Sequence, residues 1–139
     1  MTFLTSAVRD SRLGMMRDLM DRLRLDALIL TTADFFQFAT NFLLDVQPWE
    51  RPVMVLIPRD GGTRAIMNEL STHHLMMARE RDRVWLDDVQ FYAEHPRVAD
   101  RHYLLPQLPE MATELLKTSG LGFSRIGLDG VPGFLSRAA

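Results

Sequence analysis

Apolar and polar positions follow one another along the chain with periods that predict helices and strands in turn. Over residues 11–24 the apolar side chains recur every three or four positions, which is the period of an amphipathic helix. Residues 27–31 form a short apolar run without alternation, which favours a strand that is covered on both faces. A helix followed directly by a buried strand indicates the α/β class.

The same succession of predicted elements continues to residue 129. Thr32 to Asp34 offer N-cap chemistry for a short aromatic helix that ends at Asn41, a residue that tolerates left-handed backbone. Residues 53–58 and 64–68 are predicted strands joined by a tight turn at Gly61 and Gly62, which makes an antiparallel hairpin. The further predicted elements are a helix capped by Ser71 or Thr72, a strand over 83–87, a short strand over 89–92, a helix from Leu108 to a C-terminal Gly120, and a strand over 125–129.

Composition narrows the class of protein. A length of 139 residues suits one domain, and 47% hydrophobic against 24% charged residues exclude disorder and collagen-like character. The net charge of −2 and the scattered charges give no sign of nucleic acid or of an anionic membrane as a partner. The absence of cysteine excludes disulfides, zinc ribbons, thiolate nucleophiles and iron–sulfur ligation. No signal peptide or membrane-spanning run is visible, so a cytoplasmic protein is expected.

The histidines and acidic pairs of the chain do not form a convincing metal or catalytic motif. His73 and His74 are adjacent and would point about 100° apart on a helix, so they cannot chelate one ion in the i, i+4 manner. His95 and His102 flank an irregular segment and are interpreted as exposed or hydrogen-bonded side chains. Asp87 and Asp88 would face opposite sides of a strand. We therefore predict neither a catalytic residue nor a metal ligand in this chain.

Two glycines at Gly120 and Gly122 superficially suggest a dinucleotide-binding turn. The third glycine is absent, and the segment follows a helix instead of a strand, so no helix N-terminus would face a pyrophosphate. The chain also lacks a nucleophile elbow and a phosphate loop. Dinucleotide binding, serine hydrolysis and phosphoryl transfer have no support in the sequence.

The loop over residues 47–52 is the most unusual local feature, because it holds Trp49 and Arg51 between two prolines. Two interpretations are open. In the first, Trp49 folds back onto the core and Arg51 pairs with Glu50 or a nearby carboxylate. In the second, Trp49 and Arg51 form part of a binding lip, and the guanidinium of Arg51 offers a fork to a carboxylate.

The succession of segments resembles the N-terminal domain of the creatinase, prolidase and aminopeptidase P family. The resemblance covers almost all of the chain and rests on the amphipathic helix followed by residues 26–31, 38–42, 51–58, 60–61 and 126–129. The family usually has glycine in the second of these segments where this chain has Asn41. Asparagine is the non-glycine residue best suited to positive φ, so the turn can survive.

This resemblance implies a mixed, mostly parallel β-sheet with one antiparallel hairpin, flanked by helices, over residues 1–130. Residues 131–139 would begin the linker or the next helix, and the chain stops at Ala139 without a cap, as expected for a cut inside a longer protein. In the family, two divalent metal ions are held by Asp, His and Glu side chains of a following catalytic domain. The parent would then be a dinuclear metallohydrolase that cleaves peptides before proline, and this chain would be non-catalytic.

The resemblance also implies partners and a role for the loop. The expected partners are the chain's own C-terminal catalytic domain and further copies of the chain, in a homodimer or higher homo-oligomer. The domain would mediate the contacts between copies and narrow access to the active site. In the creatinase branch an aromatic residue and an arginine before the second strand reach the substrate, and Trp49 and Arg51 fall at that position. The alternative is a free-standing α/β module that binds a small molecule or a protein.

Overall fold

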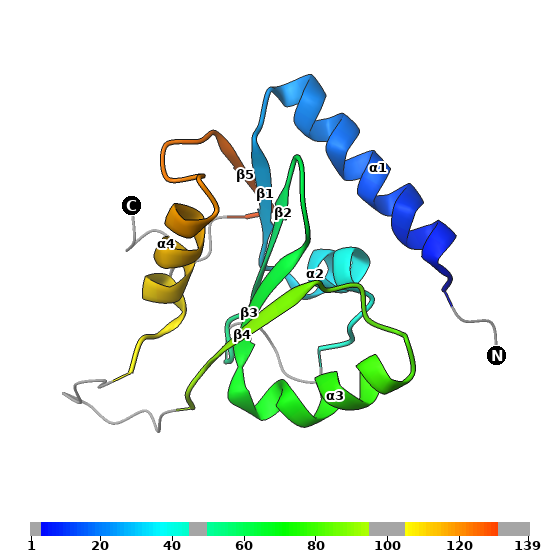
Figure 1. Cartoon of the computed structure of the whole chain (residues 1–139), viewed down its shortest axis with the longest axis vertical. Coiled ribbons are helices and arrows are strands. Elements are labelled where there is room, and N and C mark those ends of the chain that lie inside the picture. The colour runs from blue at the N-terminus through cyan, green and yellow to red at the C-terminus, as the bar shows by residue number, and fades with distance from the viewer. Residues whose placement is uncertain (1–3, 45–49, 95–104, 131–139) are drawn as a thin grey trace.

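A computed structural model describes residues 4–44, 50–94 and 105–130, which form a five-stranded sheet with helices on both faces (Figure 1). The strand order is β4-β3-β2-β1-β5. The strands are β1 (Ala27–Leu30), β2 (Met54–Pro58), β3 (Arg64–Asn68), β4 (Asp88–Tyr92) and β5 (Ile126–Leu128). The predicted α/β class and the mixed sheet flanked by helices are confirmed.

The directions of the strands correct one part of the prediction. β1 runs antiparallel to β2 and parallel to β5, while β3 runs antiparallel to β2 and parallel to β4. Two strand pairs are therefore parallel and two antiparallel, so the expectation of a mostly parallel sheet is wrong, whereas the predicted antiparallel hairpin is present as β2 and β3. The reason lies in the register, because Leu30 at the end of β1 pairs with Val55 near the start of β2. β1 therefore ends, and β2 begins, at the same end of the sheet. Two parallel strands would instead need a connection that returns to the opposite end.

The helices divide between the two faces of the sheet (Figure 1). Three of them, α1 (Ser6–Leu23), α2 (Ala33–Thr40) and α3 (Thr72–Glu80), pack on one face, and α4 (Leu108–Thr118) packs on the other. A short 3-10 helix, η1 (Glu69–Ser71), leads from β3 into α3. Met16 and Met20 of α1 are buried one turn apart, as the sequence period predicts.

Two cores explain why β1 and β2 are apolar at every position. Alternate side chains of β2 enter opposite layers, so that Val55 contributes to the core under α1, α2 and α3 while Leu56 contributes to the core under α4. Four successive residues of this strand, Met54 to Ile57, are almost completely buried. Each such side chain contributes about 1.5–3 kcal/mol of burial free energy, which anchors the sheet at its centre.

The turn residues behave as the sequence predicts. Asn41 has φ 55° and ends α2, and Gly120 has φ 73° after the end of α4. Gly61 has φ 102° in the turn between β2 and β3. These left-handed positions confirm the predicted end of the aromatic helix, the glycine after the long helix and the hairpin.

The predicted strand over residues 83–87 is wrong, whereas the shorter one over 89–92 is confirmed within β4. The segment before β4 forms hydrogen bonds with the ends of other elements instead of pairing with a strand. The N–H of Trp85 donates to the carbonyl of Thr40 at 2.8 Å, and the N–H of Asp87 donates to the carbonyl of Thr63 at 2.9 Å.

Residues 131–139, for which a helical start is expected, lie outside the described residues. None of the described helices is long and apolar enough to cross a membrane.

Candidate functional site

Arg51 lies before β2 and beside the residue that follows β4. Its Nε lies 3.4 Å from Oε2 of Glu94, and the two side chains are 28% and 39% exposed. The Nε atom is buried and has no hydrogen bond, so the ion pair is an electrostatic contact without hydrogen-bond geometry. Pairing with a nearby carboxylate was one of the two interpretations of this loop, and the partner is Glu94, not Glu50. Trp49 lies outside the described residues, and the binding lip stays a prediction.

Glu94 is itself held from two sides. Its Oε2 accepts a hydrogen bond from Nδ2 of Asn68, a residue with 2% exposure at the end of β3. The Oδ1 atom of Asn68 accepts from the N–H of Leu70 at 2.9 Å, which fixes the orientation of the amide. The backbone N–H of Glu94 donates to Oε1 of Glu69 at 2.9 Å. The carboxylate that faces Arg51 is therefore attached to the buried end of β3.

Tyr92 supplies a second contact between β4 and the loop. Its hydroxyl donates to the carbonyl oxygen of Pro52 at 2.7 Å, and the residue is 6% exposed. Burial raises the pKa of Tyr92 to about 12; the charge of Glu94 raises this pKa further, whereas the hydrogen bond with Asn68 and the charge of Arg51 lower it. The phenol therefore stays protonated and remains a donor at neutral pH.

Sequence reasoning missed Glu94, Asn68 and Tyr92 as neighbours of Arg51. One signal was present, because Tyr92 and Glu94 are two positions apart at a strand and such residues project to the same side. Which segment that side faces depends on the strand order of the sheet, which the sequence does not display.

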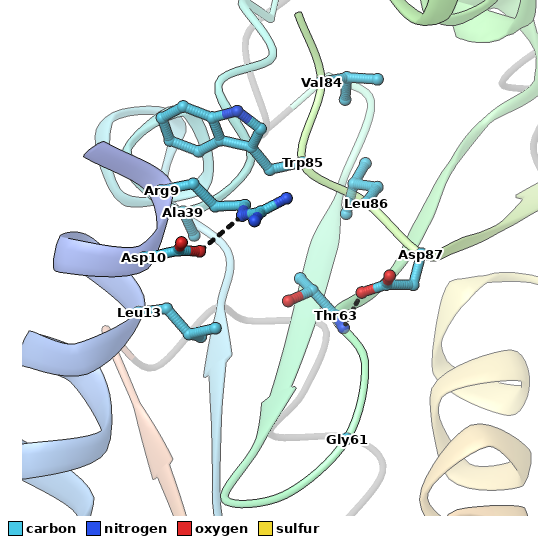
Figure 2. Close-up of a pocket in the computed structure, with 10 residues that line it drawn as sticks. All are labelled: Arg9, Asp10, Leu13, Ala39, Gly61, Thr63, Val84, Trp85, Leu86 and Asp87. Atoms are coloured by element: carbon cyan, nitrogen blue, oxygen red, sulfur yellow. Dashed lines mark hydrogen bonds and ion pairs between the residues drawn. The ribbon is translucent and has the colours of Figure 1, made fainter. Parts of the chain in front are cut away.

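A second candidate is a polar pocket of about 360 Å³ between α1, the turn after β2 and the segment before β4, shown in Figure 2. Two hydrogen bonds join polar groups of its lining: Nε of Arg9 donates to Oδ1 of Asp10 at 2.9 Å, and the N–H of Thr63 donates to Oδ2 of Asp87 at 2.8 Å. The hydrogen bond and charge of Asp10 raise the pKa of Arg9, with smaller contributions from Asp87 and Asp82. Both carboxylates that line the pocket are therefore engaged with neighbouring groups.

The histidines of the described chain do not converge. His73 and His74 lie on α3 with ring centroids 6.3 Å apart, as expected for neighbours on a helix. His95 and His102 lie outside the described residues. Within residues 4–44, 50–94 and 105–130 no three His, Asp or Glu side chains come together as a metal ion would require. Asp87 binds backbone in the polar pocket, and Asp88 begins β4 opposite Arg64.

A third candidate is an apolar groove of about 990 Å³ between α1, the start of α2 and the β1–β5 edge of the sheet. Large apolar side chains on its walls are partly open to solvent, namely Met15, Leu19, Leu23, Phe35 and Leu128. Its lining also carries charges of both signs, with Asp18 and Arg22 on successive turns of α1. Exposed apolar surface of this kind is typical of a contact with another protein surface.

The comparisons with known proteins concern the fold. No family model matches the sequence, and no curated protein matches it. Among solved structures, the N-terminal domain of Xaa-Pro dipeptidase from Lactobacillus brevis superposes with a TM-score of 0.67 at 12% identity, covering 91% of this chain and 87% of that one. A proline dipeptidase from Streptococcus pneumoniae gives a TM-score of 0.61 at 17% identity, with coverages of 91% and 80%.

One structurally similar protein is much longer than this chain. The Xaa-Pro dipeptidase from Bacillus anthracis gives a TM-score of 0.62 at 14% identity, and the match covers 94% of this chain but only 30% of that one. The chain is thus an α/β domain with a mixed sheet. It has the fold of the N-terminal domain of Xaa-Pro dipeptidases, which confirms, at the level of the fold, the resemblance drawn from the sequence.

Proposed function

We propose that this chain is the non-catalytic N-terminal domain, over residues 1–130, of a cytoplasmic metal-dependent Xaa-Pro peptidase of the prolidase, aminopeptidase P or creatinase kind. Residues 131–139 lead into its catalytic domain. The observation that carries the proposal is the similarity to the N-terminal domain of a dipeptidase over 91% of the chain. The match to only 30% of the chain of an Xaa-Pro dipeptidase supports a following domain.

The two divalent metal ions implied by the resemblance belong, in this proposal, to the catalytic domain. The described residues do not fit such a centre, because no three potential ligands among them lie together. We therefore assign the metal-activated water to that domain and derive no catalytic step from the residues of this chain.

The test of the proposal begins with the reading frame downstream of the codon for Ala139. We expect a continuation that encodes two Asp, one His and two Glu ligands, and a purified whole product that hydrolyses glycyl-proline or alanyl-proline when Mn²⁺ is added. A stop codon at that point, together with a stable chain that binds a small molecule or protein, would favour the free-standing binding module instead.

For Arg51 we propose a role as a carboxylate-binding residue at the substrate entrance, next to Trp49. The support is that no hydrogen bond joins the two terminal nitrogen atoms of Arg51 to another of the residues that the structure describes. A guanidinium binds a carboxylate through two parallel hydrogen bonds, and a free carboxylate is present in every Xaa-Pro dipeptide. In the whole enzyme Arg51→Ala should raise KM for glycyl-proline, but not for glycyl-prolinamide. Arg125→Ala, at an exposed arginine on the other edge of the sheet, is the matched control.

For the apolar groove we propose that a second copy of the chain covers it. A two-fold interface places the same surface on both copies, so a lining that carries both Asp18 and Arg22 is able to pair with itself. Sedimentation of the chain should show a dimer that Met15→Glu dissociates. Met76→Glu on α3 is the matched control, because Met76 is 53% exposed and Met15 59% exposed, but only Met15 lines the groove. A dimer unaffected by Met15→Glu would contradict this surface.

A further inference from the structure

Two contacts from the end of β4 converge on the short segment that carries Arg51. The hydroxyl of Tyr92 binds the carbonyl of Pro52 at 2.7 Å, and the carboxylate of Glu94 lies 3.4 Å from Nε of Arg51. One contact fixes the backbone next to Arg51 and the other acts on its side chain. The segment of Arg51 and Pro52 is therefore held by a hydrogen bond to its main chain and by an ion pair with its arginine side chain.

The position of the Glu94 carboxylate is set by the buried side chain of Asn68 as well as by Arg51. Its Oε2 atom, the one that faces Arg51, also accepts the hydrogen bond from Asn68, and the amide of Asn68 is held in turn by the N–H of Leu70. Because Asn68 is 2% exposed and pairs with Tyr92 across β3 and β4, this attachment belongs to the core of the sheet. Movement of Glu94 would leave a buried amide without its acceptor, which is costly.

Glu94 contacts Nε of Arg51 and leaves the edge of the guanidinium formed by the two terminal nitrogen atoms available for a ligand. A guanidinium has five N–H donors, of which Nε supplies one and the two terminal nitrogens supply four. The carboxylate of Glu94 lies nearest to Nε, while the terminal nitrogens make no hydrogen bond with the described residues. A carboxylate ligand that binds bidentately can use them without displacing Glu94.

We infer that Glu94, held by Asn68, is a positioning residue that directs the two terminal nitrogen atoms of Arg51 toward the carboxylate of a substrate. The inference rests on the proposed role of Arg51. Without the negative charge of Glu94, the long arginine side chain would sample many rotamers, and ordering it again would weaken the binding of the carboxylate. The effect is therefore confined to substrates that have a free carboxylate.

The test uses Glu94→Gln in the whole enzyme, because glutamine keeps the size and an oxygen acceptor for Asn68 while removing the charge. We expect KM for glycyl-proline to rise about threefold to tenfold with kcat nearly unchanged, which is the pattern for lost ground-state binding. KM for glycyl-prolinamide should stay unchanged. Glu69→Gln is the neighbouring control, because it keeps an oxygen acceptor for the N–H of Glu94 and removes a charge that does not pair with Arg51.

A structural readout accompanies the kinetics. In the chain of 139 residues Glu94→Gln should shift the Nε–H NMR signal of Arg51, because it removes the negative charge 3.4 Å from Nε, while Glu69→Gln should not shift it. If Arg51→Ala abolishes the preference for a free carboxylate but Glu94→Gln leaves it intact, the inference is overturned and the proposed role of Arg51 stands. If Arg51→Ala itself leaves the preference intact, both are overturned, while hydrolysis of glycyl-proline by the whole enzyme tests the domain assignment separately.

Discussion

Asp129 and Thr31 are joined by two hydrogen bonds across 98 positions of the sequence. The N–H of Thr31 donates to Oδ2 of Asp129 at 2.8 Å, and its hydroxyl donates to Oδ1 at 3.0 Å. The N–H and hydroxyl of Thr32 each donate to Oδ2 at 2.8 Å. Because Thr32 is the N-cap of α2, the carboxylate lies at the positive end of that helix. This contact ties the residue after β5 to the connection between β1 and α2.

We expect Asp129→Asn to lower the free energy of unfolding by about 1–3 kcal/mol, the usual cost of weakening charge-assisted hydrogen bonds. The variant keeps the shape of the side chain but replaces one acceptor oxygen by a donor amide that would face N–H and O–H groups. Urea denaturation at pH 7 measures the loss. The control is Glu114→Gln, an exposed carboxylate on α4 that should change stability by less than about 0.5 kcal/mol. Equal losses in the two variants would contradict a specific role for Asp129.

Tyr92 should make the fold sensitive to alkaline pH. Its pKa is raised from 10.0 to about 12 by burial, so between these pH values the unfolded chain loses the phenol proton while the folded chain keeps it. The unfolded state then binds fewer protons, and the free energy of unfolding falls as pH rises from about 10 to 12, by up to roughly 3 kcal/mol. Denaturation across this range should show the fall in the native protein and a smaller fall in Tyr92→Phe. Parallel pH profiles for the two proteins would show that another group is responsible.

The parts of the fold that depend on local pattern were predictable from the sequence. The continuous apolar run that becomes β2 is recognisable because both of its faces are buried, and each face demands apolar side chains. Asn41 and Gly120 mark the ends of helices because few residues adopt positive φ at low cost. These features are decided within a few residues, so the chain displays them directly.

The parts that depend on pairing between distant segments were not predictable. β2 runs antiparallel to β1, with Leu30 at the end of β1 opposite Val55 near the start of β2. No local sequence pattern indicates this direction. Residues 83–87 look like a strand, but Trp85 and Asp87 bond to Thr40 and Thr63 at the ends of other elements. The ion pair of Arg51 and Glu94 depends on the pairing of β3 with β4, which holds Glu94 beside Arg51.

Two glycines should respond with opposite signs to added side chains. A Cβ atom at Gly127 would lie 2.7 Å from Cδ1 of Leu25 and 2.8 Å from Cδ2 of Leu28, both of which are buried. A Cβ atom at Gly14, within α1, would meet nothing within 4 Å. We expect Gly127→Val to destabilise the protein by about 1–3 kcal/mol through overpacking, and Gly14→Ala to stabilise it by about 0.5–1 kcal/mol. Thermal denaturation of both variants measures the two signs, and a stabilising Gly127→Val would refute the close packing of β5.

Asn41 combines a backbone cost with a side-chain gain, and two substitutions separate them. It has φ 55°, and its Nδ2 atom donates to the carbonyl of Arg83 at 2.7 Å, which joins the end of α2 to the segment before β4. Asn41→Gly loses only the hydrogen bond, at about 1 kcal/mol, and relieves the backbone. Asn41→Ala loses the same bond and keeps a Cβ in the left-handed region, which adds about 1 kcal/mol. Urea denaturation should therefore rank the native protein first, the glycine variant second and the alanine variant last. If glycine proved more stable than asparagine, the bond to Arg83 would contribute less than the backbone cost that it offsets.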